Sequence, residues 1–145
     1  MGYDEYYKFE TAMEANEKDW RQTREIQKMI ERIGDLYGAV EEKFGSEGIF
    51  ERLPNATYKF YDSDGETDYG LRLYCIRVNN EAVILLNGAR KTTQNPRDFP
   101  NCSPHFDFAE KLAEAFYDAK LAELITIDGK SIEFEEDFYL EINYP

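Results

Sequence analysis

The chain has 145 residues, with 17 Lys and Arg against 30 Asp and Glu, so its formal net charge is −13. This length predicts a single domain over residues 1–145, because domains usually run to ~100–200 residues. Its 11 Tyr, 10 Phe and single Trp argue against a disordered chain, which would be poor in aromatic residues. The acidic average argues against general nucleic-acid binding and favours a basic protein partner.

No stretch approaches the ~18 apolar residues of a membrane helix, and the first residues lack the charged-then-apolar pattern of a signal peptide. We therefore expect a cytoplasmic protein with no membrane partner. Cys75 and Cys102 show no CxxC spacing, which indicates neither a zinc site nor a disulfide framework. We expect both to be reduced, structural thiols, and we expect no metal and no other cofactor.

The first part of the chain predicts one strand and two helices. Residues 6–13 are aromatic and partly alternating, which suits a strand, although their acidic start leaves a short helix open. Asn16 is placed to cap a helix whose first turn is acidic. Apolar residues then recur at three- and four-residue steps over 26–40, as on one face of a helix. Gly34 and Gly38 are expected to divide this stretch into two helices.

The middle of the chain predicts three strands, at residues 57–61, 71–78 and 82–90. Asn79 and Asn80 join the last two, and both tolerate the left-handed backbone of a tight hairpin. Residues 83–86 show no polar alternation, so we expect both sides of this segment to be buried, as in a central strand.

The last part of the chain predicts a loop, a helix and a hairpin. Residues 94–104 are rich in Pro and Asn, and Ser103 before Pro104 is typical of a helix start. Apolar residues from Phe108 to Leu121 supply one face of this helix. Strands are predicted at 124–127, 131–134 and 138–142. The expected fold is α+β, a mainly antiparallel sheet with two N-terminal helices, one C-terminal helix and a C-terminal β hairpin.

The net charge is distributed unevenly along the chain. Residues 1–70 hold 17 acids and 9 bases, and residues 98–145 hold 12 acids and 3 bases. Residues 71–97 hold one acid, Glu81, and five bases, so the predicted hairpin and the loop after it are a basic island. Arginine there is notable because its planar, permanently charged fork grips phosphate through two hydrogen bonds.

Two interpretations of this island stay open. Its cations either pair with acids elsewhere as salt bridges, worth ~0–1 kcal/mol each at a surface, or face a phosphate. The clustering favours the phosphate site. Strand geometry adds a constraint, because Arg72 and Arg77 are five residues apart and an unbroken strand sends them to opposite faces. They line one site only if a bulge intervenes.

Residues 72–77, a short hairpin and residues 83–94 together resemble the central hairpin of the RelE/ParE-like toxins, in their phage-related, HigB-like branch. That branch often carries an arginine strand, a hairpin, an apolar strand that ends in Gly, and a basic pair followed by Thr and Gln. The resemblance implies a RelE-like core over residues 1–97, followed by a helix and an acidic hairpin extension over 98–145.

The resemblance implies a bacterial or phage toxin of a type II toxin–antitoxin system, which enters the ribosome, cleaves mRNA without a metal, and is held inactive by an antitoxin protein. In such endoribonucleases the 2′-hydroxyl of the RNA attacks the adjacent phosphorus, while basic side chains and Tyr or His stabilise charge and move protons. The implied catalytic residues are Arg72, Arg90 and Lys91, the substrate-binding candidates are Arg77, Arg97 and Tyr74, and Tyr58 and His105 are further candidates for proton transfer or phosphate contact.

The acidic balance leaves a second function open. Toxins of this type are usually basic, whereas the C-terminal hairpin carries Glu133, Glu135, Glu136 and Asp137. Such a run discourages aggregation at a sheet edge, or it covers the basic strands, or it offers an acidic face that mimics nucleic acid. The alternative is therefore a non-enzymatic acidic binding protein, such as a phage-type inhibitor, that engages a basic protein partner.

Overall fold

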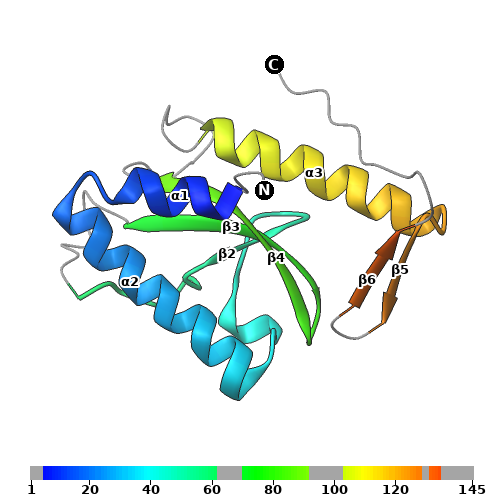
Figure 1. The fold of residues 1–145 in the computed structure, drawn as a ribbon, viewed down its shortest axis with the longest axis horizontal. Coiled ribbons are helices and arrows are strands. Elements are labelled where there is room, and N and C mark those ends of the chain that lie inside the picture. The colour runs from blue at the N-terminus through cyan, green and yellow to red at the C-terminus, as the bar shows by residue number, and fades with distance from the viewer. Residues whose placement is uncertain (1–4, 62–69, 92–102, 129–130, 135–145) are drawn as a thin grey trace.

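The computed structural model describes residues 5–61, 70–91, 103–128 and 131–134. Its helices are α1 (Glu5–Met13), α2 (Glu17–Arg32) and α3 (Ser103–Leu121), with a π-helical turn at Ile33–Tyr37 and a 3-10 turn at Glu41–Lys43. Its strands are β1 (Gly45–Ser46), β2 (Glu51–Leu53), β3 (Leu71–Asn79), β4 (Ala82–Arg90), β5 (Ile125–Asp128) and β6 (Ser131–Phe134). The fold is α+β, as predicted, with an antiparallel sheet in the order β1-β2-β3-β4 and a separate β5-β6 pair (Figure 1).

The first element is a helix, so the strand predicted over residues 6–13 is wrong. Phe9 and Met13 are four residues apart and both are buried, which matches one side of a helix. A strand would have placed Tyr7 and Thr11 on the same side as these two, yet both are exposed. The alternating aromatic residues are therefore a weaker signal here than the four-residue spacing of the two side chains that reach the core.

Helix α2 begins as predicted. The Oδ1 atom of Asn16 accepts a hydrogen bond from the backbone N–H of Asp19 at 3.0 Å, which caps the helix. The helix then passes into the π-helical turn, which ends at Gly38 with a φ of 74°. The second helix expected before residue 45 is thus reduced to two short turns.

Residues 57–61 do not form the predicted strand, and β2 takes that place in the sheet. Arg52 of β2 lies opposite Tyr74 of β3. After Pro54, the Oδ1 atom of Asn55 accepts hydrogen bonds from the backbone N–H groups of Thr57 at 3.3 Å and Tyr58 at 3.1 Å. These bonds turn the chain and occupy N–H groups that a sheet ladder would need.

The predicted β3-β4 hairpin is confirmed, and β3 is buried on both faces. Leu73 and Cys75 pack with the apolar side chains of α1 and α2, whereas Tyr74 and Ile76 pack with those of α3. Figure 1 shows the two green strands passing between α2 and α3. The sheet therefore separates two apolar layers.

Strand β4 is an edge strand of this sheet, so the central position predicted for residues 83–86 is wrong. Its apolar run has another cause, because α1 and α3 contact it from opposite faces. Val83 and Leu85 pack against the layer of α1 and α2, while Ile84 and Leu86 belong to the layer of α3. Helices that cover both faces of a strand remove its polar alternation, whether the strand lies at the centre or at the edge of its sheet.

Helix α3 begins at Ser103 as predicted and buries Phe106, Ala109 and Phe116 against β3 and β4. Leu121, expected on the apolar face, is instead 84% exposed at the end of the helix. The predicted strands at 124–127 and 131–134 form the β5-β6 pair, and the strand predicted at 138–142 lies outside the described residues. In the described part of the chain, no helix is long and apolar enough to cross a membrane.

Strands β3 and β4 approach each other most closely at Gly88. A Cβ atom there would lie 1.7 Å from the carbonyl oxygen of Arg72. At Gly34, in the π-helical turn, a Cβ atom would have no neighbour within 4 Å. Gly88 is therefore required by the sheet, and Gly34 is not.

We expect Gly88→Ala to lower the free energy of unfolding by ~1–3 kcal/mol or more, because the clash is with backbone rather than with a flexible side chain. Gly34→Ala, the matched control, should leave it unchanged or raise it by ~0.5–1 kcal/mol, because alanine favours helix. Urea denaturation of both variants measures this. Similar stabilities for the two variants would contradict the close approach at Gly88.

Candidate functional site

Arg72, the first catalytic candidate, lies in a buried ion-pair cluster with Arg52 and Glu47. Glu47 Oε1 lies 2.6 Å from Arg72 Nη1 and 2.9 Å from Arg52 Nε, and the three side chains are only 10–11% exposed. Arg52 also donates to the carbonyl oxygen of Pro54. Burial, with the nearby charge of Arg72, lowers the pKa of Arg52 to about 10. A phosphate would reach Arg72 only by displacing Glu47.

The pairing of the two short strands β1 and β2 explains this cluster. Glu47 follows β1 directly, and Gly45 of β1 lies opposite Arg52 of β2. A Cβ atom on Gly45 would lie 2.9 Å from the Cζ atom of Arg52, so glycine leaves the space in which the guanidinium lies. The narrow β1-β2 pair thus brings the one carboxylate to two arginines.

Arg77 and Tyr74, two substrate-binding candidates, both contact other residues of the fold. The Nη1 atom of Arg77 donates to the Asn80 side-chain oxygen at 3.1 Å and to the carbonyl oxygen of Ala39 at 3.4 Å. Tyr74 is fully buried, and its ring meets those of Phe50 and Phe106 edge-on. Tyr74 therefore contributes to the core, whereas Arg77 is partly buried and is held by two neighbouring oxygens.

Arg72 and Arg77 lie on opposite faces of β3, as their spacing predicts. The register between β3 and β4 does shift, from Leu73 opposite Gly88 to Cys75 opposite Leu85. The extra residue belongs to β4, so the alternation of β3 from Arg72 to Ile76 stays intact. The bulge that would have joined the two arginines in one site is on the other strand.

The predicted basic pair is divided between two environments. The Nε and Nη2 atoms of Arg90 lie 2.7 and 2.5 Å from Asp19 Oδ1, at the first turn of α2. Lys91 is only 6% exposed, and its backbone N–H donates to the carbonyl oxygen of Gly70. Arg97, the remaining candidate, lies outside the described residues.

One cavity brings together two residues that the sequence singled out separately. Arg90, at the end of β4, and His105, in the first turn of α3, both line a hollow of about 460 Å³. Asp19 and Asn87 add polar side chains to the same wall. Four elements converge here, namely the end of α1, the start of α2, the end of β4 and the start of α3. We call this hollow the Arg90–His105 cleft.

The electrostatics of the cleft suit proton transfer. Burial lowers the pKa of His105 below its usual value of 6.5, and the negative charge of Glu5 opposes this shift only in part. The imidazole is therefore neutral at pH 7 and able to accept a proton. Asn87 Nδ2 donates to Glu5 Oε2 at 3.0 Å, which holds that carboxylate against β4. Arg90 is the cation of the cleft, and an incoming anion would share it with Asp19.

Among the described residues, no group of three or more His, Cys, Asp or Glu side chains lies close enough to hold a metal ion. Cys75 is buried and forms no disulfide, and burial raises the pKa of its thiol well above the usual value. It is therefore an inert core residue, as predicted. Cys102 lies outside the described part of the chain.

The candidates predicted from the sequence were mainly cations of β3 and β4. A second hollow was not predicted. This hollow is lined by Arg32, Lys43, Tyr37 and Tyr58, of which only Tyr58 was a candidate. Nothing local distinguishes the other three from ordinary surface residues, because the end of α2 and the two short turns that carry them are brought together only by the tertiary fold.

Comparisons of the chain with protein-family models, with curated proteins and with solved structures found no match. The likeness to the RelE/ParE-like toxins is therefore carried by residues 72–94 alone and stays a prediction.

The Glu47 cluster yields a test of stability. Glu47→Gln should lower the free energy of unfolding by ~3 kcal/mol, because it leaves two neighbouring buried arginines without their anion. Glu17→Gln is the matched control, since the Glu17–Arg21 pair is exposed and should be worth ~0.3–0.5 kcal/mol. Chemical denaturation of both variants gives the comparison. If the two substitutions cost the same small amount, the cluster does not support the sheet.

Proposed function

We propose that the chain is a RelE/ParE-like toxin that cleaves RNA without a metal, with its reaction centre in the Arg90–His105 cleft. The observation that carries this proposal is the presence of both residues in the wall of one cavity. A guanidinium and a neutral imidazole that line one hollow can supply the charge stabilisation and the proton transfer that phosphodiester cleavage by a neighbouring hydroxyl uses. The proposed substrate is mRNA bound to the ribosome in the cytoplasm.

In the proposed reaction, the 2′-hydroxyl oxygen of the bound RNA attacks the adjacent phosphorus while His105 accepts its proton. The bond from phosphorus to the 5′-oxygen breaks, and that oxygen takes a proton from water. The products are a 2′,3′-cyclic phosphate and a free 5′-hydroxyl. Arg90 stabilises the negative charge that develops on the phosphoryl oxygens, and Asp19 fixes its orientation through the two short contacts.

The proposal gives the other predicted residues structural roles. Arg72 pairs with Glu47, Arg77 binds the backbone near Ala39, and Lys91 is almost fully buried. Their substitution should therefore reduce stability and activity together. Loss of activity in a fully stable protein is expected only for residues that line the cleft.

One surface supports the alternative function, a non-enzymatic binding protein for a basic partner. Asp107, Glu110, Glu114 and Asp118 follow one another at steps of three and four residues, so they share one side of α3. None of these four side chains is buried. In the toxin proposal this side of α3 is where a basic segment of the antitoxin would dock.

Cleavage assays test the proposed reaction. A fluorescent mRNA bound to purified ribosomes should be cut by the full chain, and His105→Asn should lower the rate by ~100-fold or more, as loss of a general base does. Lys111→Ala, an exposed residue on α3, is the control and should cut at the wild-type rate. Induced expression of the wild type should arrest bacterial growth, and His105→Asn should relieve the arrest.

The dependence of the cleavage rate on pH tests the role of His105 as the base. The base works only when it is unprotonated, so the cleavage rate should rise with pH up to the pKa of His105, below 6.5, and be flat above it. A wild-type rate for His105→Asn would overturn the assignment of the base. No cleavage, together with salt-sensitive binding of a basic protein, would favour the binding function instead.

A further inference from the structure

A second hollow, which we call the tyrosine pocket, lies between the end of α2, the two short turns that follow it, and the turn after β2. Its volume is about 190 Å³, below the ~300 Å³ at which pockets for drug-sized ligands begin. The pocket therefore has room for the planar ring of a ligand whose other parts extend toward the cations at its edge. It shares no lining residue with the Arg90–His105 cleft.

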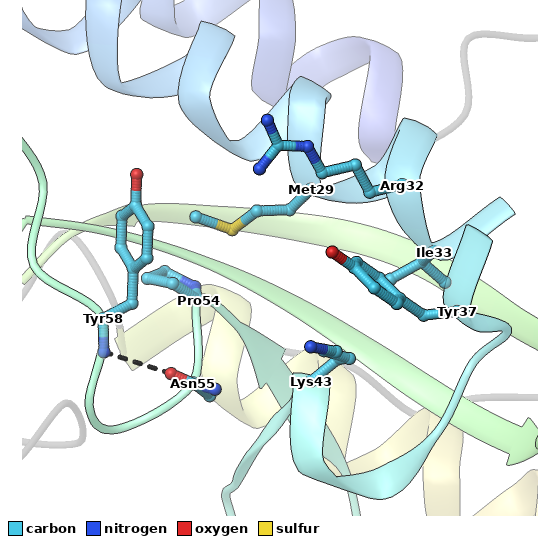
Figure 2. A pocket seen from close by; sticks show the side chains of 8 residues that line it. All are labelled: Met29, Arg32, Ile33, Tyr37, Lys43, Pro54, Asn55 and Tyr58. Atoms are coloured by element: carbon cyan, nitrogen blue, oxygen red, sulfur yellow. Dashed lines mark hydrogen bonds between the residues drawn. The ribbon is translucent and has the colours of Figure 1, made fainter. Parts of the chain in front are cut away.

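Two tyrosine rings form opposite sides of this pocket. Figure 2 shows Tyr58 and Tyr37 on either side of the hollow, with Met29 and Pro54 between them. The two tyrosines are 40% and 46% exposed, so each ring presents part of its surface to solvent. Part of each ring is exposed to a planar ligand, although Lys43 lies over one face of Tyr37, and Met29 and Pro54 offer an apolar floor.

Two cations face the same space. Arg32 is the last residue of α2, and within the described part of the chain it makes no hydrogen bond or ion pair, whereas Arg52, Arg72 and Arg90 each pair with a carboxylate. Lys43 Nζ lies 4.0 Å from the centre of the Tyr37 ring. In Figure 2 the two cationic groups lie on opposite sides of the pocket mouth.

The pocket is held in shape by hydrogen bonds that do not use its cations. Asn55 Nδ2 donates to the carbonyl oxygen of Glu42 at 3.0 Å, which ties the turn of Tyr58 to the turn of Lys43. Tyr58 Oη donates to Glu25 Oε1 at 2.5 Å, which fixes the orientation of the Tyr58 ring. Burial and this bond raise the pKa of Tyr58 to about 12, and its ring stays neutral at pH 7. A ligand therefore meets a largely preformed site.

We propose that the tyrosine pocket binds a nucleoside phosphate, with its base between Tyr37 and Tyr58 and its phosphate on Arg32 and Lys43. Each base face stacks on an aromatic ring whatever the base, and the arginine fork matches two phosphate oxygens. Neither tyrosines nor cations alone would select this ligand, but their combination excludes neutral rings and bare anions. The nucleoside phosphate is either a free mononucleotide or one nucleotide of a single strand.

Isothermal titration calorimetry of the full chain tests this proposal with defined probes. AMP should bind at least tenfold more tightly than adenosine or inorganic phosphate, because only AMP uses both parts of the pocket. A short deoxythymidine oligonucleotide, which lacks the 2′-hydroxyl needed for cleavage, distinguishes the two sources. Affinity at least tenfold above that of TMP indicates a strand, and equal affinity indicates the free nucleotide.

Matched variants assign the binding to this pocket. Arg32→Ala should weaken the binding of AMP by about tenfold or more, as loss of a charge-assisted hydrogen bond does. Arg24→Ala is the control, because Arg24 is an exposed arginine of the same helix that lies over Trp20, outside the pocket. Tyr58→Phe should retain most of the affinity, and Tyr58→Ala should lose it.

The proposal is overturned if neither AMP nor the oligonucleotide binds, or if Arg32→Ala and Arg24→Ala bind AMP equally well. The result is independent of the cleavage reaction, because the pocket and the cleft are composed of different residues. Titration of the His105→Asn variant with AMP tests this independence. The variant should bind AMP with wild-type affinity whether or not the wild-type protein cuts RNA.

Discussion

Burial of β3 on both faces is the constraint on which the rest of the structure depends. From Leu71 to Ile76 every residue except Arg72 is buried, between the layer of α1 and α2 and the layer of α3. A charge in such a strand is costly unless its counter-charge is buried with it. Glu47 meets this requirement for Arg72, and the absence of a side chain on Gly88 lets β4 approach closely enough to complete the layer. Among the described residues of the basic island, Arg72, Arg77 and Arg90 each bind an oxygen of the fold itself.

The sequence predicted best the features that depend on local chemistry. The Asn16 cap, the hairpin at Asn79-Asn80 and the helix start at Ser103 each follow from a few neighbouring residues. It failed where a distant contact decides the outcome. Residues 6–13 are helical because Phe9 and Met13 reach the core together, and residues 57–61 stay out of the sheet because β2 occupies the edge of β3.

Prediction of the candidate sites was limited in the same way, because contacts between distant residues decide where their side chains lie. Strand alternation predicts that Arg72 and Arg77 lie on opposite faces of β3. It does not predict their partners, because Glu47 and Ala39 are far away in sequence. The meeting of Arg90 with His105 and that of Arg32 with Lys43 depend on how separate elements pack. The net charge of −13 also conceals local surfaces of opposite character, since α3 carries its acids outward while the tyrosine pocket holds two cations.

A titration of His105 by NMR tests the central claim most directly, namely that the Arg90–His105 cleft is the functional centre. His105 is the only histidine of the chain, so its imidazole gives a single, unambiguous resonance. The account predicts a pKa below 6.5, and a shift of this resonance when an uncleavable 2′-deoxy oligonucleotide is added. A pKa at or above 6.5, with a resonance that does not move on addition of the oligonucleotide, would contradict it.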